Sequence, residues 1–236
     1  MGSINFEKLD KLAELSVSTG VALQKGQNLL ITAPSDALPL VRLIAKHAYK
    51  AGAGLVTPFF SDSEITLARY KYASDESFDV AADWLYKGMG EAFDKNTARL
   101  AIVGEDPMLL DGQDPDKIGR SNKAMSAASK PARERITSFN INWNIVAWPG
   151  KAWACRVFPT LEPDEAQYRL ATAIFSASRV DCDDPEQAWK DHNSSLLTRS
   201  RWLNNQNFKY LHFTGPGTDL KVGLALNHTW RGGASK

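Results

Sequence analysis

Residues 28–60, which read NLLITAPSDALPLVRLIAKHAYKAGAGLVTPFF, decide the fold class of this 236-residue chain. Residues 28–33 are strand-length and apolar on both faces, which is typical of a buried parallel strand. Ser35 then offers an N-cap, and apolar residues recur at helical spacing from Val41 to Ala48. Residues 55–60 form a second strand-like run. A strand, a helix and a strand in this order predict a βαβ unit with a parallel sheet.

The same alternation continues along most of the chain. Further strands are expected at 99–104 and 140–147. Helices are expected at about 5–19, 35–51, 61–68, 81–94, 116–137, 163–178 and 185–203. Pro58 suggests that the 55–60 run is an edge strand or a strand end. The sequence therefore predicts an α/β domain over residues 1–204, with a mostly parallel sheet and helices on both faces in a Rossmann-like three-layer arrangement.

The hydrophobic period changes from helical towards two after Asn204. Apolar residues alternate over 208–213 and again over 220–224, and the link TGPGTD at 214–219 has turn chemistry. Residues 228–231 could start a third strand. A short antiparallel segment can add to the edge of the first sheet or begin another domain. The abrupt change of period favours the second option, so residues 205–236 are expected to start a truncated β-rich C-terminal domain.

Composition excludes several classes of protein. Lysine plus arginine and aspartate plus glutamate nearly cancel, leaving a net charge of +1, which argues against a dedicated nucleic-acid surface. The two cysteines form no disulfide framework, and the N-terminus lacks an apolar signal core. No apolar run approaches the length of a membrane span. A cytoplasmic protein is expected.

A dinucleotide fingerprint is missing from the first strand-to-helix turn. That turn, residues 33–36, has no glycine and carries Asp36, which would repel a phosphate. Gly52 and Gly54 lie at a helix end, where glycine acts as a cap. Nucleotide binding therefore rests on fold analogy alone.

Candidate catalytic and metal-binding residues do not form a complete site. Cys182 is surrounded by carboxylates, and Cys155 has only Arg156 beside it, so neither has the setting of a nucleophile. The four histidines lack metal-ligand spacing, and packed or partly exposed side chains are expected. These are His47, His192, His212 and His228. The acidic loop 104–114, with Asp106 and Asp111, follows a strand where α/β sheets bind ligands, although a solvated loop is the simpler interpretation. No catalytic, cofactor-binding or metal-ligating residue is assigned.

Three stretches of the chain resemble the sequences of a known protein family. They are LQKGQNLLITA at 23–33, LVRLIAKHAYKAGAG at 40–54 and HFTGPGTDLKVGL at 212–224. Together they resemble the aminopeptidase T and aminopeptidase S family of thermophilic-type metalloaminopeptidases. Residues 143–147 and 177–181 fit the same pattern, so the resemblance covers essentially the whole chain.

The resemblance implies a longer, two-domain, homodimeric enzyme that removes N-terminal residues from peptides. Its β-rich C-terminal domain holds two divalent metals, zinc or cobalt, through glutamate, histidine and aspartate. The ligands and a catalytic tyrosine would lie downstream of 215–219, beyond Lys236, so this chain alone is expected to be inactive. The alternative is a self-sufficient, non-enzymatic α/β binding or dimerisation domain, with a crevice near Asp106 and Asp111.

Overall fold

The computed structural model describes residues 3–231, and the chain divides into two compact units, Met1–Asp181 and Cys182–Lys236. The expected boundary was after residue 204. The division into compact units precedes the last long helix and places that helix in the second unit.

A four-stranded parallel sheet forms the centre of the first unit. Its strands are β1 (Leu29–Pro34), β2 (Val56–Ser61), β3 (Ala98–Val103) and β4 (Trp143–Ala147), in the order β2-β1-β3-β4. The predicted α/β class and parallel sheet are confirmed. Pro58 lies in β2, which is an edge strand as expected. The chain order reverses direction between β1 and β3, which makes this the topological switch point.

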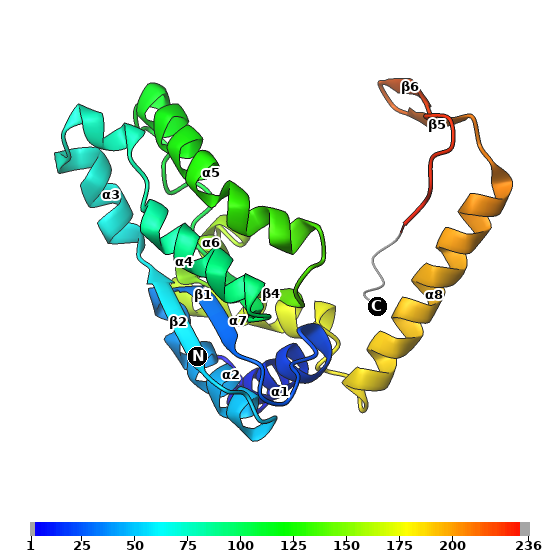
Figure 1. Ribbon diagram of the computed structural model, residues 1–236, viewed down its shortest axis with the longest axis horizontal. Helices are drawn as coiled ribbons and strands as arrows, with labels where there is room; N and C mark the ends of the chain where they lie inside the picture. The colour runs from blue at the N-terminus through cyan, green and yellow to red at the C-terminus, as the bar shows by residue number, and fades with distance from the viewer. Residues whose placement is uncertain (1–2, 232–236) are drawn as a thin grey trace. The chain divides into compact units, whose positions relative to one another are not determined.

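Helices cover both faces of the sheet (Figure 1). One face carries α1 (Phe6–Leu15), α2 (Leu38–Lys50) and α7 (Pro163–Ala177), and the other carries α4 (Asp83–Asp94) and α5 (Pro115–Thr137). Two helices follow edge strands: α3 (Ser63–Tyr72) and α6 (Lys151–Val157). Short helical turns lie at Ser16–Gly20, Ser35–Ala37 and Asp75–Asp79.

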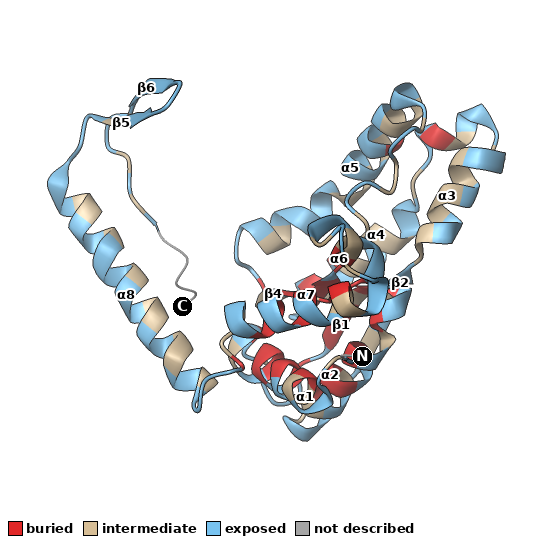
Figure 2. Cartoon of the chain, turned by 180° about the vertical axis from the view of Figure 1, so that it is seen from behind, coloured by how far each residue is buried: buried red, intermediate tan, exposed pale blue. Residues whose placement is uncertain are grey.

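The core follows the two-residue period of the strands. Leu29 and Ile31 are completely buried, whereas Leu30, on the opposite face, packs in a cluster with Phe93 of α4 and Ala132 of α5. The buried residues of Figure 2 accordingly gather around β1 and its neighbours. A strand buried on both faces explains why residues 29–33 are almost continuously apolar.

Two elements of the first unit differ from expectation. Helix α6 was not predicted, because seven residues are too few for a clear helical period. Strand β4 begins at Trp143 rather than at residue 140. The side chain of Asn142 donates a hydrogen bond from Nδ2 to the carbonyl of Val21 at 2.6 Å, which ties the chain before β4 to a loop.

The second unit consists of α8 (Pro185–Gln206) and a hairpin of β5 (Tyr210–Gly215) and β6 (Thr218–Gly223). The turn places Gly217 at φ +73°, as the third residue of a type II turn requires. Residues 228–231 form no strand, contrary to expectation. Trp230 instead exchanges backbone hydrogen bonds with the side chain of Asn204, at 2.7 and 3.0 Å, so α8 replaces a neighbouring strand as its partner.

Candidate functional site

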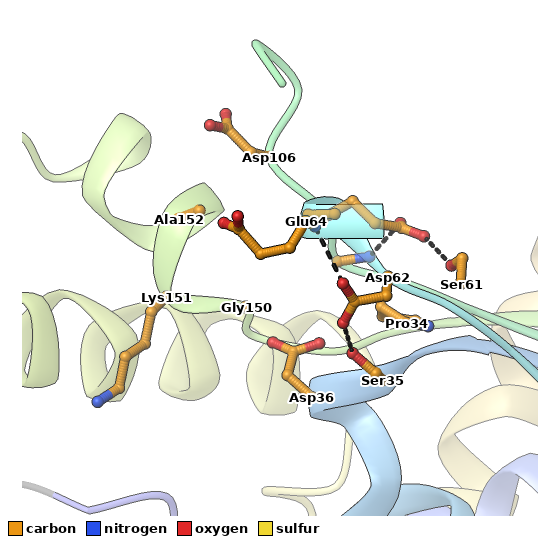
Figure 3. Close-up of a pocket in the computed structure, with 13 residues that line it drawn as sticks. Pro34, Ser35, Asp36, Ser61, Asp62, Glu64, Asp106, Gly150, Lys151 and Ala152 are labelled. Carbon is orange, nitrogen blue, oxygen red and sulfur yellow. Dashed lines mark hydrogen bonds between the residues drawn. The ribbon is translucent and has the colours of Figure 1, made fainter. Parts of the chain in front are cut away.

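A crevice of about 180 Å³ lies at the carboxyl ends of all four parallel strands (Figure 3). This is the edge of a parallel sheet at which ligands usually bind. Each strand contributes residues at or shortly after its carboxyl end. They are Pro34, the last residue of β1, with Ser35 and Asp36; Ser61, the last residue of β2, with Asp62, Ser63 and Glu64; Gly104, Glu105 and Asp106 after β3; and Gly150, Lys151 and Ala152 shortly after β4.

Gly104 and Gly150 allow backbone segments to pack closely beside the switch point. A Cβ added to Gly150 would lie 2.1 Å from the carbonyl oxygen of Gly104, and one added to Gly104 would lie 2.3 Å from the carbonyl oxygen of Trp148. The buried Trp148 donates its indole N–H to Oδ2 of Asp36 at 3.0 Å. The segment after β4 therefore lies against the segments after β3 and β1, with no space for a side chain between them.

Carboxylates dominate the crevice. Asp62 accepts a hydrogen bond from the hydroxyl of Ser35 at 2.6 Å and others from the amides of Glu64 and Ile65. The Ser35 bond is the main reason that the pKa of Asp62 is lowered from its ordinary value. These bonds make Asp62 the N-cap of α3, which gives it a structural role as well as a charge.

The third strand adds two more acidic side chains. Glu105 accepts a hydrogen bond from Ser61 at 3.1 Å and Asp106 lies 3.4 Å from the guanidinium of Arg156. Lys151 pairs with Asp164 outside the crevice at 2.7 Å, and that contact raises the pKa of Lys151. The lining is therefore net negative. It suits an ammonium or guanidinium group and repels a phosphate, which argues against a nucleotide.

The structure brings together only part of the acidic loop that the sequence singles out. Asp106 lines the crevice, whereas Asp111 is exposed and lies outside it. Asp36 also lines it. Ser35, Asp62 and Glu64 were missed as lining residues, although their position directly after a strand was a usable signal.

The remaining candidate residues have structural partners. His47 is nearly buried, with Nε2 at 3.0 Å from Oδ1 of Asp10, and His192 packs edge-on against Trp189. His212 pairs across the hairpin with Asp219 at 2.6 Å. Within residues 3–231, no group of three or more His, Cys, Asp or Glu side chains is arranged to hold a metal ion.

Both cysteines and the two candidate glycines have simple roles in the structure. Cys155 and Cys182 are free thiols, the first partly exposed and the second exposed. Gly52 adopts φ +91° just after α2, as a helix-terminating glycine does, and a Cβ on Gly54 would lie 2.6 Å from Oδ1 of Asn28.

In the described part of the chain, no helix is long and apolar enough to cross a membrane.

Comparison with known proteins gives a consistent result along the chain. Residues 5–236 match the family model described as thermophilic metalloprotease (M29). Aminopeptidase T of Thermus thermophilus is 48% identical over 96% of this chain, and aminopeptidase AmpS of Bacillus subtilis is 37% identical over 97%. The solved structure of wild-type AmpT from Thermus thermophilus superimposes with a TM-score of 0.92 at 47% identity, covering 97% of this chain.

Each alignment covers a larger share of this chain than of the protein that it matches. The alignments cover nearly all of this chain but 56% of each of these relatives and 56% of the solved chain. The chain thus spans about half the length of the curated relatives that it matches. With a family match from residue 5 to residue 236 and relatives this similar, the chain belongs to the thermophilic metalloprotease (M29) family.

Proposed function

We propose that this chain is the N-terminal portion of a metal-dependent aminopeptidase that releases N-terminal amino acids from peptides. The observation that carries the proposal is the unbroken similarity to aminopeptidases over 96% of the chain, at 48% identity. The TM-score of 0.92 to AmpT, over 97% of the chain, supports a shared architectural role. In the proposed enzyme, this portion shapes the surroundings of the active site.

The residues described here do not suit the two divalent metals, zinc or cobalt, that the proposal includes. Four carboxylates of the crevice are engaged, Asp62 by Ser35, Glu105 by Ser61, Asp36 by Trp148 and Asp106 by Arg156. Within residues 3–231, no group of three or more His, Cys, Asp or Glu side chains could hold a metal ion. We place the ligands in the part of the relatives' length that this chain does not span. The isolated 236-residue chain should then be inactive, and residues 205–236 would begin the β-rich catalytic domain.

The proposal also includes a cellular location and an oligomeric state for the full-length enzyme. Two free thiols fit a reducing compartment, so a cytoplasmic location is part of it. The homodimer expected from the family resemblance is also included, with peptides as the substrates. These statements concern the full-length enzyme, and each can be tested separately from the others.

The direct test is an activity assay of the purified chain. Leucine p-nitroanilide and other amino-acid p-nitroanilides would be incubated with the chain plus added zinc or cobalt, with Thermus thermophilus aminopeptidase T as the positive control. We expect turnover by the control and none by the chain. Metal-dependent turnover that co-purifies with the chain would overturn the claim that it lacks the metal site.

The alternative function is a self-sufficient, non-enzymatic binding or dimerisation domain. The observation in its favour is the acidic crevice at the carboxyl ends of the strands, which is an ordinary position for a ligand. It requires Cys182–Lys236 to be stable without further chain, and limited proteolysis tests that requirement.

A further inference from the structure

Three aspartates of this chain directly precede a very small residue. They are Asp36 before Ala37, Asp62 before Ser63 and Asp111 before Gly112. An aspartate in such a position can rearrange without an enzyme, because a small neighbour leaves the next backbone amide accessible to the aspartate's own carboxyl group. The rearrangement requires a free carboxyl group, a free amide and space for the backbone to rotate. The three sites differ in these requirements.

The first two aspartates are held by their surroundings. Oδ2 of Asp36 accepts the indole N–H of Trp148 at 3.0 Å, and Ala37 is completely buried. The carboxylate of Asp62 caps α3 through two backbone amides and also accepts the hydroxyl of Ser35 at 2.6 Å. That last bond is the main cause of the lowered pKa of Asp62, which keeps its carboxyl group in the ionised, less reactive form.

The third aspartate, Asp111, is free. It is exposed, and its carboxylate makes no hydrogen bond or ion pair with the residues that the structure describes. The amide of Gly112 likewise donates to none of these residues. The amides on either side are engaged, since Asp111 donates to the carbonyl of Met108 at 2.9 Å and Gln113 donates to that of Leu110 at 3.1 Å. The reactive pair is thus free within an otherwise hydrogen-bonded loop.

The turn that contains Asp111 and Gly112 explains why this amide is free. The bond from Gln113 to Leu110 closes a four-residue turn in which Asp111 and Gly112 are the central positions. Gly112 has φ +77°, as the third residue of a type II turn requires, and the closing bond of such a turn does not use its amide. A Cβ added to Gly112 would meet no atom within 4 Å, so the backbone has space to rotate.

We propose that Asp111 is a site of spontaneous isoaspartate formation. The amide nitrogen of Gly112 attacks Cγ of Asp111, an N–Cγ bond forms, and the amide proton leaves with the carboxyl hydroxyl as water. A water molecule then opens the succinimide ring. Opening at Cγ restores aspartate, whereas opening at the main-chain carbonyl leaves the chain joined through Cγ. One water leaves and one enters, so the mass of the chain is unchanged.

The product changes the loop that joins β3 to α5. The main chain then runs through Cβ and Cγ of Asp111, which lengthens the turn, and the former main-chain carbonyl becomes a free carboxylate. One end of this loop lines the crevice at Glu105 and Asp106. The other end is Asp114, which caps α5 by accepting the amide of Asp116 at 2.9 Å. The reaction itself requires no aminopeptidase activity.

Ageing of the purified 236-residue chain tests the proposal. The folded chain is kept in warm, neutral buffer made with heavy-oxygen water, and tryptic peptides are analysed by mass spectrometry with electron-transfer fragmentation, which distinguishes isoaspartate from aspartate. Trypsin releases Asp111 in the peptide 100–117 and places Asp36 and Asp62 in two other peptides. We expect isoaspartate to accumulate at Asp111 at least about tenfold faster than at Asp36 or Asp62, because those sites must first open locally.

Two controls separate the effect of the structure from that of the sequence. Asp111→Glu keeps the charge but requires a six-membered ring, so no isomer should form at this position. In urea, the rate at Asp111 should change less than about threefold and the rate at Asp62 should rise by more, because only Asp62 is protected by the fold.

Three results would overturn the proposal, whatever the activity assay shows. The first is a rate at Asp111 in the folded chain that is no higher than the rate at Asp62. The second is a rate at Asp111 that rises at least about tenfold on unfolding, which would show that the fold protects this turn. The third is an Asp111 isomer without heavy oxygen, since opening of the ring must add oxygen from water.

Discussion

At the scale of single residues, Gln27 is the side chain whose loss should matter most outside the apolar core. It is 7% exposed, and its Nε2 donates to the carbonyl of Asn96 at 2.9 Å and to Oδ1 of Asn142 at 2.7 Å. It thereby connects the residues that precede β1, β3 and β4. We expect Gln27→Ala to lower the free energy of unfolding by about 1–3 kcal/mol, because buried polar partners are left unsatisfied.

Urea denaturation followed by circular dichroism measures this effect. Gln24→Ala is the matched control, because its exposed amide donates to Ala22 in the same loop. Its cost should stay below roughly 0.5 kcal/mol. Equal effects of the two substitutions would show that the connection between the strand starts contributes no special stability.

At the scale of elements, a charged contact joins α1 to α2. Oδ1 of Asp10 in α1 lies 3.0 Å from Nε2 of His47 and 3.0 Å from Nζ of Lys46, both in α2. The hydrogen bond with His47 is the main cause that lowers the pKa of Asp10, and the bond with Lys46 adds to it. A carboxyl with a lowered pKa stabilises the fold above its unfolded pKa, and this stabilisation is lost as the pH falls through the folded pKa.

Asp10→Asn should therefore destabilise the chain near pH 6, and its difference from the unsubstituted chain should shrink as the pH falls below about 4. Unfolding free energies measured by urea denaturation at a series of pH values test this expectation. Glu14→Gln makes the same change of charge at an exposed position of α1 and should show little pH-dependent difference. A difference for Asp10→Asn that stays constant from pH 6 to pH 3.5 would contradict the assignment.

At the scale of the whole molecule, the two units differ in their capacity to stand alone. The α/β unit has a continuous apolar core, whereas α8, β5 and β6 contain no buried residue, as Figure 2 shows. A two-stranded hairpin without a packed face is marginally stable in water. Trypsin should therefore cleave at Lys209 or Lys221 well before it cleaves at Lys46 or Lys50 of α2.

Mass spectrometry of a digestion time course identifies the order of cleavage. Early loss of the hairpin would support its proposed role as the start of a β-rich domain that requires further chain. Survival of Lys209 and Lys221 for as long as the α2 sites would favour the alternative, a self-sufficient binding domain. The same digest also compares the proposed boundary after residue 204 with the division at residue 181.

Local pattern in the sequence was sufficient to predict the parallel α/β class, because burial of a strand or helix leaves a short-range period in the chain. The missing amide of Pro58 indicated an edge strand or a strand end, and the resemblance to the family rested on three particular stretches of sequence. Other features depended on strand order. Asp36 meets Trp148 and Ser35 meets Asp62 only because distant segments end at one edge of the sheet. The edge position of β4 has the same origin. WNIVA is an ordinary apolar strand in sequence, and only the order of the strands determines that it lies at the edge of the sheet.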